Sequence, residues 1–373
     1  MALYVTFGFG SLASISTKSM EVHADFDTFW RSAEALWEGR DIYDTGAELA
    51  NLNPPFWTVL ISPLGLLKPI IAYHLFVLLT VLVTIGYLAW TASELELRAE
   101  WVLGGGSALL LSSPMLGTLA LGQIYSLLAL GLVAAWVADR RNRSVPSGVA
   151  LGLVVAVKPL LAPVVLWPLV SRKWQAFVAA LIAGTVVTLV GEIVAGAGTT
   201  LGWIRYMSSL RPDGFWDNNT IPGAASRIFT ENDYVEPIAS VPWALPVAYA
   251  LGIGSVILSA VVARRDPDMG LWALVAASLL ASPIAWHNYL VLLGPAVLLL
   301  LARGWVAPAC LLLALQLIPP DWSAPWRYGE APWAPLALTF YLYILVVYWL
   351  TLLVASERKQ PAVQDHSLGS TLH

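Results

Sequence analysis

The chain has 373 residues, of which 58% are hydrophobic and only 12% are charged, and its formal net charge is −4. Soluble globular domains carry about 25% charged residues, so most of this surface must face lipid. The composition therefore predicts an all-α, polytopic membrane protein. It shows no basic patch suited to nucleic acid, and the lone Cys310 excludes an intramolecular disulfide.

Apolar segments recur along the chain and give twelve candidate membrane crossings. They lie at about 1–17, 70–92, 101–118, 121–138, 145–157, 159–170, 174–196, 241–263, 269–284, 287–302, 305–318 and 334–355. Several are shorter than the ~20 residues that a full span needs, and the region 145–170 is expected to be a short hairpin broken at Lys158-Pro159. The polar tail, 356–373, is expected to be disordered, which leaves 1–355 as a single membrane domain.

Basic residues set the orientation of the predicted crossings. With the N-terminus in the cytoplasm, the loops that fall inside hold Arg98, Arg140 to Arg143, Arg172-Lys173, Arg264-Arg265, Arg303 and Arg358-Lys359. Both termini are then cytoplasmic, and the longer segments 18–69, 197–240 and 319–333 lie outside. Because loops carry sites and spans carry scaffold, we expect function on the extracytoplasmic face of the plasma membrane.

The first outer segment contains a predicted amphipathic helix. Its apolar residues share one helical face, at Phe26, Phe29, Trp30, Ala33 and Trp37. Gly39 stands where a helix C-cap is expected. Because one face of this helix is apolar and the other polar, it is predicted to lie on the membrane surface. Asn53-Pro54-Pro55 then breaks the chain, and the apolar piece 56–67 is expected to lie in the interface without crossing.

Two acidic residues, Asp25 and Asp27, stand at the start of this interfacial helix. Either could cap the helix, since Asp is a favoured N-cap residue. The alternative is a general base at the membrane surface. Carboxylates at the edge of a bilayer cost free energy and are seldom kept without a use, so the pair favours a membrane enzyme over a channel or scaffold.

Lys158 and Gln123 are polar residues at outer ends of apolar segments. The lysine either snorkels to the interface or pairs with an anion such as a lipid phosphate. Gln123, which follows Gly122, either faces a ligand or satisfies a helix end.

Two further outer stretches are rich in polar groups. Asn218 and Asn219, with Arg227 nearby, could bind sugar hydroxyls and phosphate, or could form a turn before a short helix. Trp286-His287 follows Ser282-Pro283, and the histidine is either structural or functional. The sequence has no metal-ligand spacing and no glycine-rich phosphate loop, so we predict no metal site and no cofactor.

Taken together, these motifs resemble glycosyltransferase family 87, whose members use polyprenyl-phosphate sugars and have the multi-spanning C-type glycosyltransferase (GT-C) fold. The resemblance covers about 20 to 355. Its markers in order are Asp25-Phe26 with Phe29-Trp30, Glu38 to Tyr43, Asn53-Pro54-Pro55, Gly122-Gln123, Lys158-Pro159, Asn218-Asn219-Thr220 leading to Arg227, and Ser282-Pro283 through Trp286-His287.

The resemblance implies an inverting transfer on the extracytoplasmic face. Asp25 would be the general base, with Asp27 as the alternative, and Lys158, Arg227 and His287 would stabilise the leaving phosphate. The other implied substrate-binding residues are Tyr43, Gln123, Asn218, Asn219 and Trp286. Mannose is the family's commonest donor sugar and arabinofuranose the alternative, and the acceptor would be a glycolipid or glycan.

Two other functions remain open from the residues alone. A transporter or flippase for lipid-linked sugars would need charged residues near mid-membrane, and Glu192 is the one candidate. A non-catalytic scaffold would lose no activity when Asp25 is changed.

Overall fold

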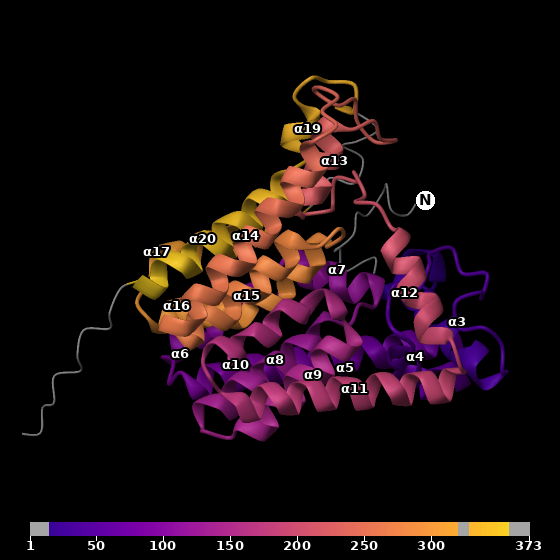
Figure 1. Cartoon of the computed structure of the whole chain (residues 1–373), viewed down its shortest axis with the longest axis horizontal. Helices are drawn as coiled ribbons and strands as arrows, with labels where there is room; N and C mark the ends of the chain where they lie inside the picture. The colour runs from indigo at the N-terminus through magenta and orange to yellow at the C-terminus, as the bar shows by residue number, and fades with distance from the viewer. Residues whose placement is uncertain (1–14, 320–327, 358–373) are drawn as a thin grey trace, which may run out of the picture.

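The computed structural model describes residues 15–319 and 328–357, and this part of the chain is a bundle of helices joined by loops (Figure 1). An isolated β-bridge joins Asn218 to Trp286. Most of the first predicted crossing (1–17), most of the tail and 320–327 of the third outer segment lie outside the described residues. The all-helical prediction is confirmed for the rest.

The first half of the chain forms the lower layer of the view in Figure 1. Its helices are η1 (Met20–His23), α3 (Ala24–Trp37), α4 (Pro55–Ile61), η2 (Ser62–Leu66), α5 (Pro69–Glu94), α6 (Ala99–Leu110), α7 (Ser113–Leu121), α8 (Tyr125–Arg140), α9 (Ser144–Val157), η3 (Pro159–Val165), α10 (Leu166–Val170) and α11 (Trp174–Ala195). Several begin with proline at the first or second position, where its missing N–H costs no hydrogen bond.

The second half forms most of the upper layer. Its helices are α12 (Thr199–Ser209), α13 (Ile221–Phe229), α14 (Ala244–Arg265), α15 (Pro267–Ala281), η4 (His287–Leu293), α16 (Gly294–Ala302), α17 (Val306–Gln316), α19 (Ala334–Ala337) and α20 (Phe340–Glu357). The segment 334–355, expected as one helix, is therefore broken before Phe340. There the Thr339 hydroxyl donates a hydrogen bond to the Pro335 carbonyl and accepts one from the Arg227 guanidinium.

Four described helices are long and apolar enough to cross a membrane, namely α5, α11, α14 and α20. A fifth candidate is the pair α6 and α7, which is bent by 48°. The remaining apolar helices have 10–17 residues, counting pieces joined in sequence. The chain is thus a multi-pass membrane protein, whereas the predicted count of twelve crossings remains a prediction.

Ion pairs gather at one end of the bundle. Arg140 contacts Glu94 at 3.2 Å and Asp268 at 2.7 Å, and Arg303 pairs with Asp268 at 3.2 Å. Lys173 reaches Asp139 at 2.6 Å. These contacts bring together the loops that the positive-inside rule assigns to one side of the membrane, although which side faces the cytoplasm stays a prediction.

The region 145–170 is broken at Lys158, as predicted, because α9 ends at Val157 and the 3₁₀ helix η3 begins at Pro159. α9 packs closely on α11. A Cβ added to Gly148 would lie 2.0 Å from the Ala176 carbonyl oxygen, and one on Gly152 would lie 2.4 Å from that of Ala180. Small residues four apart thus let the two backbones touch, a common device of membrane helices.

The helix α3 carries the predicted apolar stripe on one face, whereas its position on the membrane surface stays a prediction. Phe26, Phe29 and Ala33 are buried, whereas Trp37 at the end of the stripe is 57% exposed. The Trp37 indole donates to the Ser62 carbonyl at 2.7 Å, which ties α3 to η2. Gly39 has φ +69°, the left-handed conformation expected after a helix end. α4 and η2 follow Pro54 as the predicted second apolar piece.

Candidate functional site

Asp25 lies in the first turn of α3, which begins at Ala24. The capping prediction is wrong for both acids, because His23 occupies the N-cap position and no side chain caps the helix. A short 3₁₀ helix runs directly into α3 and moves its start upstream of both carboxylates. Asp27 instead pairs with Arg31 one turn later at 2.6 Å. Asp25 has no such neighbour on its own helix.

The groups around Asp25 come from three distant parts of the chain. Burial raises the pKa of Asp25 from 3.8 to about 6, although the side chain keeps partial solvent contact. A hydrogen bond from Gln123 and the charge of Lys158 favour the carboxylate, and the charge of Asp217 opposes it. A carboxyl group with a pKa near neutrality suits a general base.

Lys158 lies at the break between α9 and η3 and is only 7% exposed. Its ammonium donates to the Asn53 side-chain oxygen at 2.8 Å and lies 5.5 Å from the centre of the Tyr289 ring. The snorkelling alternative requires the ammonium to reach water, and the structure buries it instead. A lysine held by an amide oxygen and an aromatic face can still attract an anion.

Gln123 is placed beside Asp25 by a close contact between two turns. Gly122 ends α7 with φ +70°, and a Cβ there would lie 2.6 Å from the Cβ of Phe26. Only glycine allows this approach, because another residue would be strained and would push α3 away. Gln123 follows directly and is 4% exposed.

His287 and Asp217 form a buried pair, and the charge of Asp217 acts on Asp25. The Nδ1 atom of His287 lies 2.7 Å from an Asp217 carboxylate oxygen, and the same carboxylate accepts the His287 backbone N–H at 3.3 Å. The Tyr341 ring lies 5.1 Å from the imidazole. An Asp on Nδ1 fixes the ring's orientation and directs Nε2 away from it.

Asn218, Asn219 and Trp286 form a junction between the loop before α13 and the loop after α15. The Asn218 amide donates to the Asp213 and Pro283 carbonyls and accepts from the Ala285 N–H. Asn219 donates to the Trp286 carbonyl at 3.3 Å. The amide of Asn218 is committed to backbone partners, so this residue supports the position of the Asp217–His287 pair.

Arg227 lies in α13 and is fully buried. Its guanidinium donates to the carbonyls of Gly214, Phe215 and Asn218, and to the Thr339 hydroxyl. Burial lowers the pKa of Arg227 to about 10. These bonds connect the segment 214–218 to Thr339, directly before α20, which is the role of a structural arginine.

Tyr43 lies on the loop between α3 and α4. Its hydroxyl donates to the Asn53 carbonyl at 2.8 Å, and burial raises its pKa. Tyr43 thereby supports the residue whose side chain holds Lys158.

The structure adds two residues to which the sequence pattern assigned no role, His23 and Asp217. His23 is fully buried between Tyr73, on which its ring stacks at 3.6 Å, and the Ala120 carbonyl, 2.6 Å from Nδ1. It therefore anchors the start of α3 on α7, and burial lowers its pKa. Asp217 directly precedes the Asn pair in the sequence, but its partner, His287, lies 70 residues away, so no local pattern indicates the pair.

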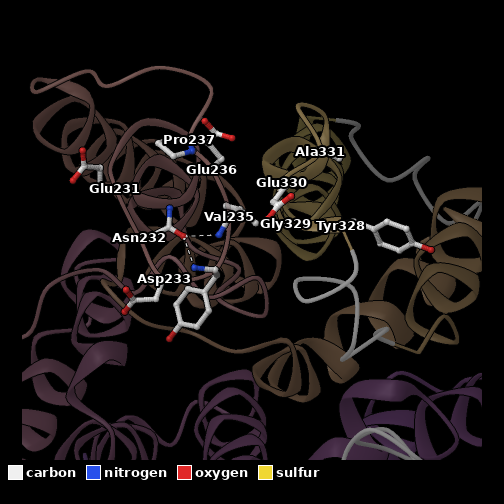
Figure 2. Close-up of a pocket in the computed structure, with 11 residues that line it drawn as sticks. Glu231, Asn232, Asp233, Val235, Glu236, Pro237, Tyr328, Gly329, Glu330 and Ala331 are labelled. Carbon is white, nitrogen blue, oxygen red and sulfur yellow. Dashed lines mark hydrogen bonds between the residues drawn. The ribbon is translucent and has the colours of Figure 1, made fainter.

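A pocket of about 660 Å³ lies elsewhere, between 231–237 and 328–331. Figure 2 shows its acidic side chains, Glu231, Asp233, Glu236 and Glu330, spread around the opening without converging. Its lining includes none of the residues around Asp25. Within the described ranges, no three His, Cys, Asp or Glu side chains stand close enough to share a metal ion.

The family model described as glycosyltransferase family 87 matches residues 51–283, more than half of the chain. The chain belongs to glycosyltransferase family 87. The resemblance of the sequence motifs is thus confirmed, and the protein is a multi-pass membrane glycosyltransferase. The match includes Gln123, Lys158, the Asn pair and Arg227, and begins after Asp25.

Two curated relatives come from Mycobacterium tuberculosis. A polyprenol-phosphate-mannose-dependent alpha-(1-2)-phosphatidylinositol mannoside mannosyltransferase is 28% identical over 83% of this chain and 79% of its own length. An alpha-(1->3)-arabinofuranosyltransferase is 28% identical over 47% of this chain and 42% of its own length. Among solved structures, ArnT from Cupriavidus metallidurans bound to undecaprenyl phosphate matches 89% of this chain and 71% of that chain at 20% identity and a TM-score of 0.39.

Proposed function

We propose that this family 87 enzyme moves a sugar, with inversion, from a polyprenyl-phosphate donor to a hydroxyl of a glycolipid or glycan. Asp25 is the general base. The observation that carries the proposal is the cluster itself, in which Asp25 in the first turn of α3 accepts a hydrogen bond from buried Gln123 and feels the charge of buried Lys158, while burial raises its pKa to about 6. A base of that pKa is ionised at neutral pH and still accepts a proton readily.

The reaction needs one proton acceptor and one site for a departing anion. The acceptor hydroxyl attacks the anomeric carbon, its proton passes to Asp25, and the bond from that carbon to the phosphate oxygen breaks. The lipid phosphate leaves with the bonding electrons. Lys158 is a buried cation whose charge acts on Asp25, and His287 is a further donor, so we assign to these two the stabilisation of the growing negative charge.

Mannose is the donor sugar we propose, because the relative matched over most of the chain is named for a mannose donor. Arabinofuranose is the second candidate, since an arabinofuranosyltransferase also matches at 28% identity, over less of the chain. The residues 1–355 act as one GT-C membrane domain, with both termini in the cytoplasm and Asp25 on the outer face of the plasma membrane.

A flippase is less well supported than a transferase. Its sequence candidate, Glu192, lies near the end of α11 and accepts the backbone N–H groups of Gly198 and Thr200. A carboxylate bound in this way orders the turn before α12 and is not available to carry a charge across the membrane.

The test compares wild type with Asp25→Asn and Asp27→Asn as purified full-length protein in lipid nanodiscs. Radiolabelled polyprenyl-phosphate mannose, or the arabinofuranose donor, is supplied with membrane glycolipids, and labelled product is counted. Loss of transfer in Asp25→Asn, with Asp27→Asn active, supports the proposal. If Asp25→Asn keeps wild-type transfer, the assignment of Asp25 as the general base is wrong. If wild type is inactive with both donors, the transferase proposal fails.

A further inference from the structure

A second cavity, of about 600 Å³, lies between the loop after α3 and the start of α12. Its size falls within the range of about 300–1,000 Å³ that is typical of small-molecule sites. Its polar and aromatic lining residues include Arg40, Asp41, Tyr43, Asn51, Trp203 and Tyr206. In Figure 1, α12 stands at the same end of the bundle as α3 and α4.

Two aromatic side chains of α12 line this cavity together. Trp203 and Tyr206 are three residues apart, so they share one face of the helix. The Trp203 indole is fixed by donating to the Leu52 carbonyl at 3.3 Å, whereas Tyr206 is 44% exposed. Flat aromatic faces bind the C–H face of a sugar ring, and neighbouring carboxylate and guanidinium groups bind its hydroxyls.

The opposite face of α12 is exposed and carries Leu201 and Ile204 together with Arg205 and Ser208. Leu201 and Ile204 are each 49% exposed and, at 100° per residue, lie across the helix from Trp203 and Tyr206. An exposed face that combines apolar and basic side chains suits the membrane interface, and the aromatic face of α12 is turned toward the protein. The cavity thus lies where the head group of a lipid-anchored molecule would be.

Hydrogen bonds connect the cavity wall to α3, the helix that carries Asp25. The Thr28 hydroxyl, one turn after Asp25 on α3, donates to the Leu49 carbonyl at 3.1 Å, next to the lining residue Ala50. On the same loop, Asn51 donates to Ser32 of α3 at 3.0 Å. The loop that borders the cavity is therefore held on the helix that carries the base.

We propose that this cavity is an acceptor subsite, which binds a sugar unit of the membrane-anchored glycan whose hydroxyl is to be glycosylated. The inference rests on the proposed function and adds the chemistry of acceptor recognition. Trp203 and Tyr206 stack on the sugar ring, and Asp41 and Arg40 bind its hydroxyls, whereas the buried Asn51 amide holds the loop on Ser32 and Thr58. The donor phosphate is bound elsewhere, at Lys158.

The experiment uses full-length protein in nanodiscs and measures KM for the acceptor glycolipid, KM for the donor, and kcat. Tyr206→Ala is the main variant because its exposed side chain contributes little to folding. Loss of one aromatic stacking contact is expected to raise the acceptor KM about tenfold, with the donor KM and kcat within about twofold. Trp203→Leu should act in the same direction.

The matched control is Tyr328→Ala, because Tyr328 is 42% exposed and lines the acidic cavity of Figure 2. It should leave the acceptor KM unchanged. The inference is overturned if Tyr206→Ala and Trp203→Leu both keep the wild-type acceptor KM, if they raise only the donor KM, or if Tyr328→Ala raises the acceptor KM instead.

Direct binding separates this inference from the proposed function. Mannobiose and arabinobiose are added to wild type and to Tyr206→Ala without donor, and saturation-transfer NMR records contact. Binding that is lost in the variant supports the subsite even if no transfer is found. Transfer by wild type together with equal binding and equal acceptor KM in Tyr206→Ala refutes the subsite and leaves the transferase intact.

Discussion

Replacing Asp25 by Asn should abolish transfer and also stabilise the protein at neutral pH. The structure surrounds this carboxyl with protein, which raises its pKa from 3.8 to about 6. Below pH 3.8 both the folded and unfolded states hold the proton. As the pH rises toward 6, the unfolded state releases it first, so the folded state loses stability over this interval and not above it.

The size of this effect follows from the shift itself. A rise from 3.8 to about 6 corresponds to about 3 kcal/mol, since one pKa unit is about 1.4 kcal/mol. This is an upper bound, because partial exposure of the side chain screens its charge. Asn keeps the shape and carries no charge, so Asp25→Asn should gain up to that amount at pH 7.5 and almost nothing at pH 4.

The assay is unfolding of detergent-solubilised protein by SDS, followed by circular dichroism, at several values between pH 4 and 7.5. Transfer by wild type is measured over the same range and should fall at pH 5 to about a tenth of its plateau, as the base becomes protonated. A stability gain that is absent at pH 7.5, or that is equal at every pH, would refute the reasoning. Asp27→Asn is the control.

Three further predictions concern the groups around the base. Lys158→Met should lower kcat by a factor of about 10²–10³. It should also raise the pH at which the rate is half-maximal, because the cation favours the ionised form of Asp25, and a pH–rate profile measures this shift. Gly122→Ala should destabilise by about 1–3 kcal/mol through its positive φ and its contact with Phe26, whereas Gly104→Ala, in open space, should not; SDS unfolding compares the two. Arg227→Lys should destabilise by about 3 kcal/mol or more, since each buried acceptor left unpaired costs about 1–3 kcal/mol; an unchanged unfolding midpoint would contradict this.

Periodicity and composition allowed much of the scaffold to be predicted. The apolar residues from Phe26 to Ala33 repeat at helical spacing, and Pro159 after Lys158 prevents α9 from continuing. Such signals are local, because they depend on neighbours within one or two turns. For the same reason the sequence predicted that Asp25 lies at a membrane boundary, and motif order indicated the family.

Tertiary structure decided which side chains meet and therefore what each one does. Arg227 looked like a phosphate ligand, yet its guanidinium is committed to carbonyls and to Thr339, 112 residues away. Asp217 joins His287 only because the loops that hold them are bridged between Asn218 and Trp286. The pKa of Asp25 depends on burial and on Gln123 and Lys158 together. Such contacts carry no sequence periodicity, since they follow from packing between helices far apart in the chain, and only the folded bundle brings them within reach.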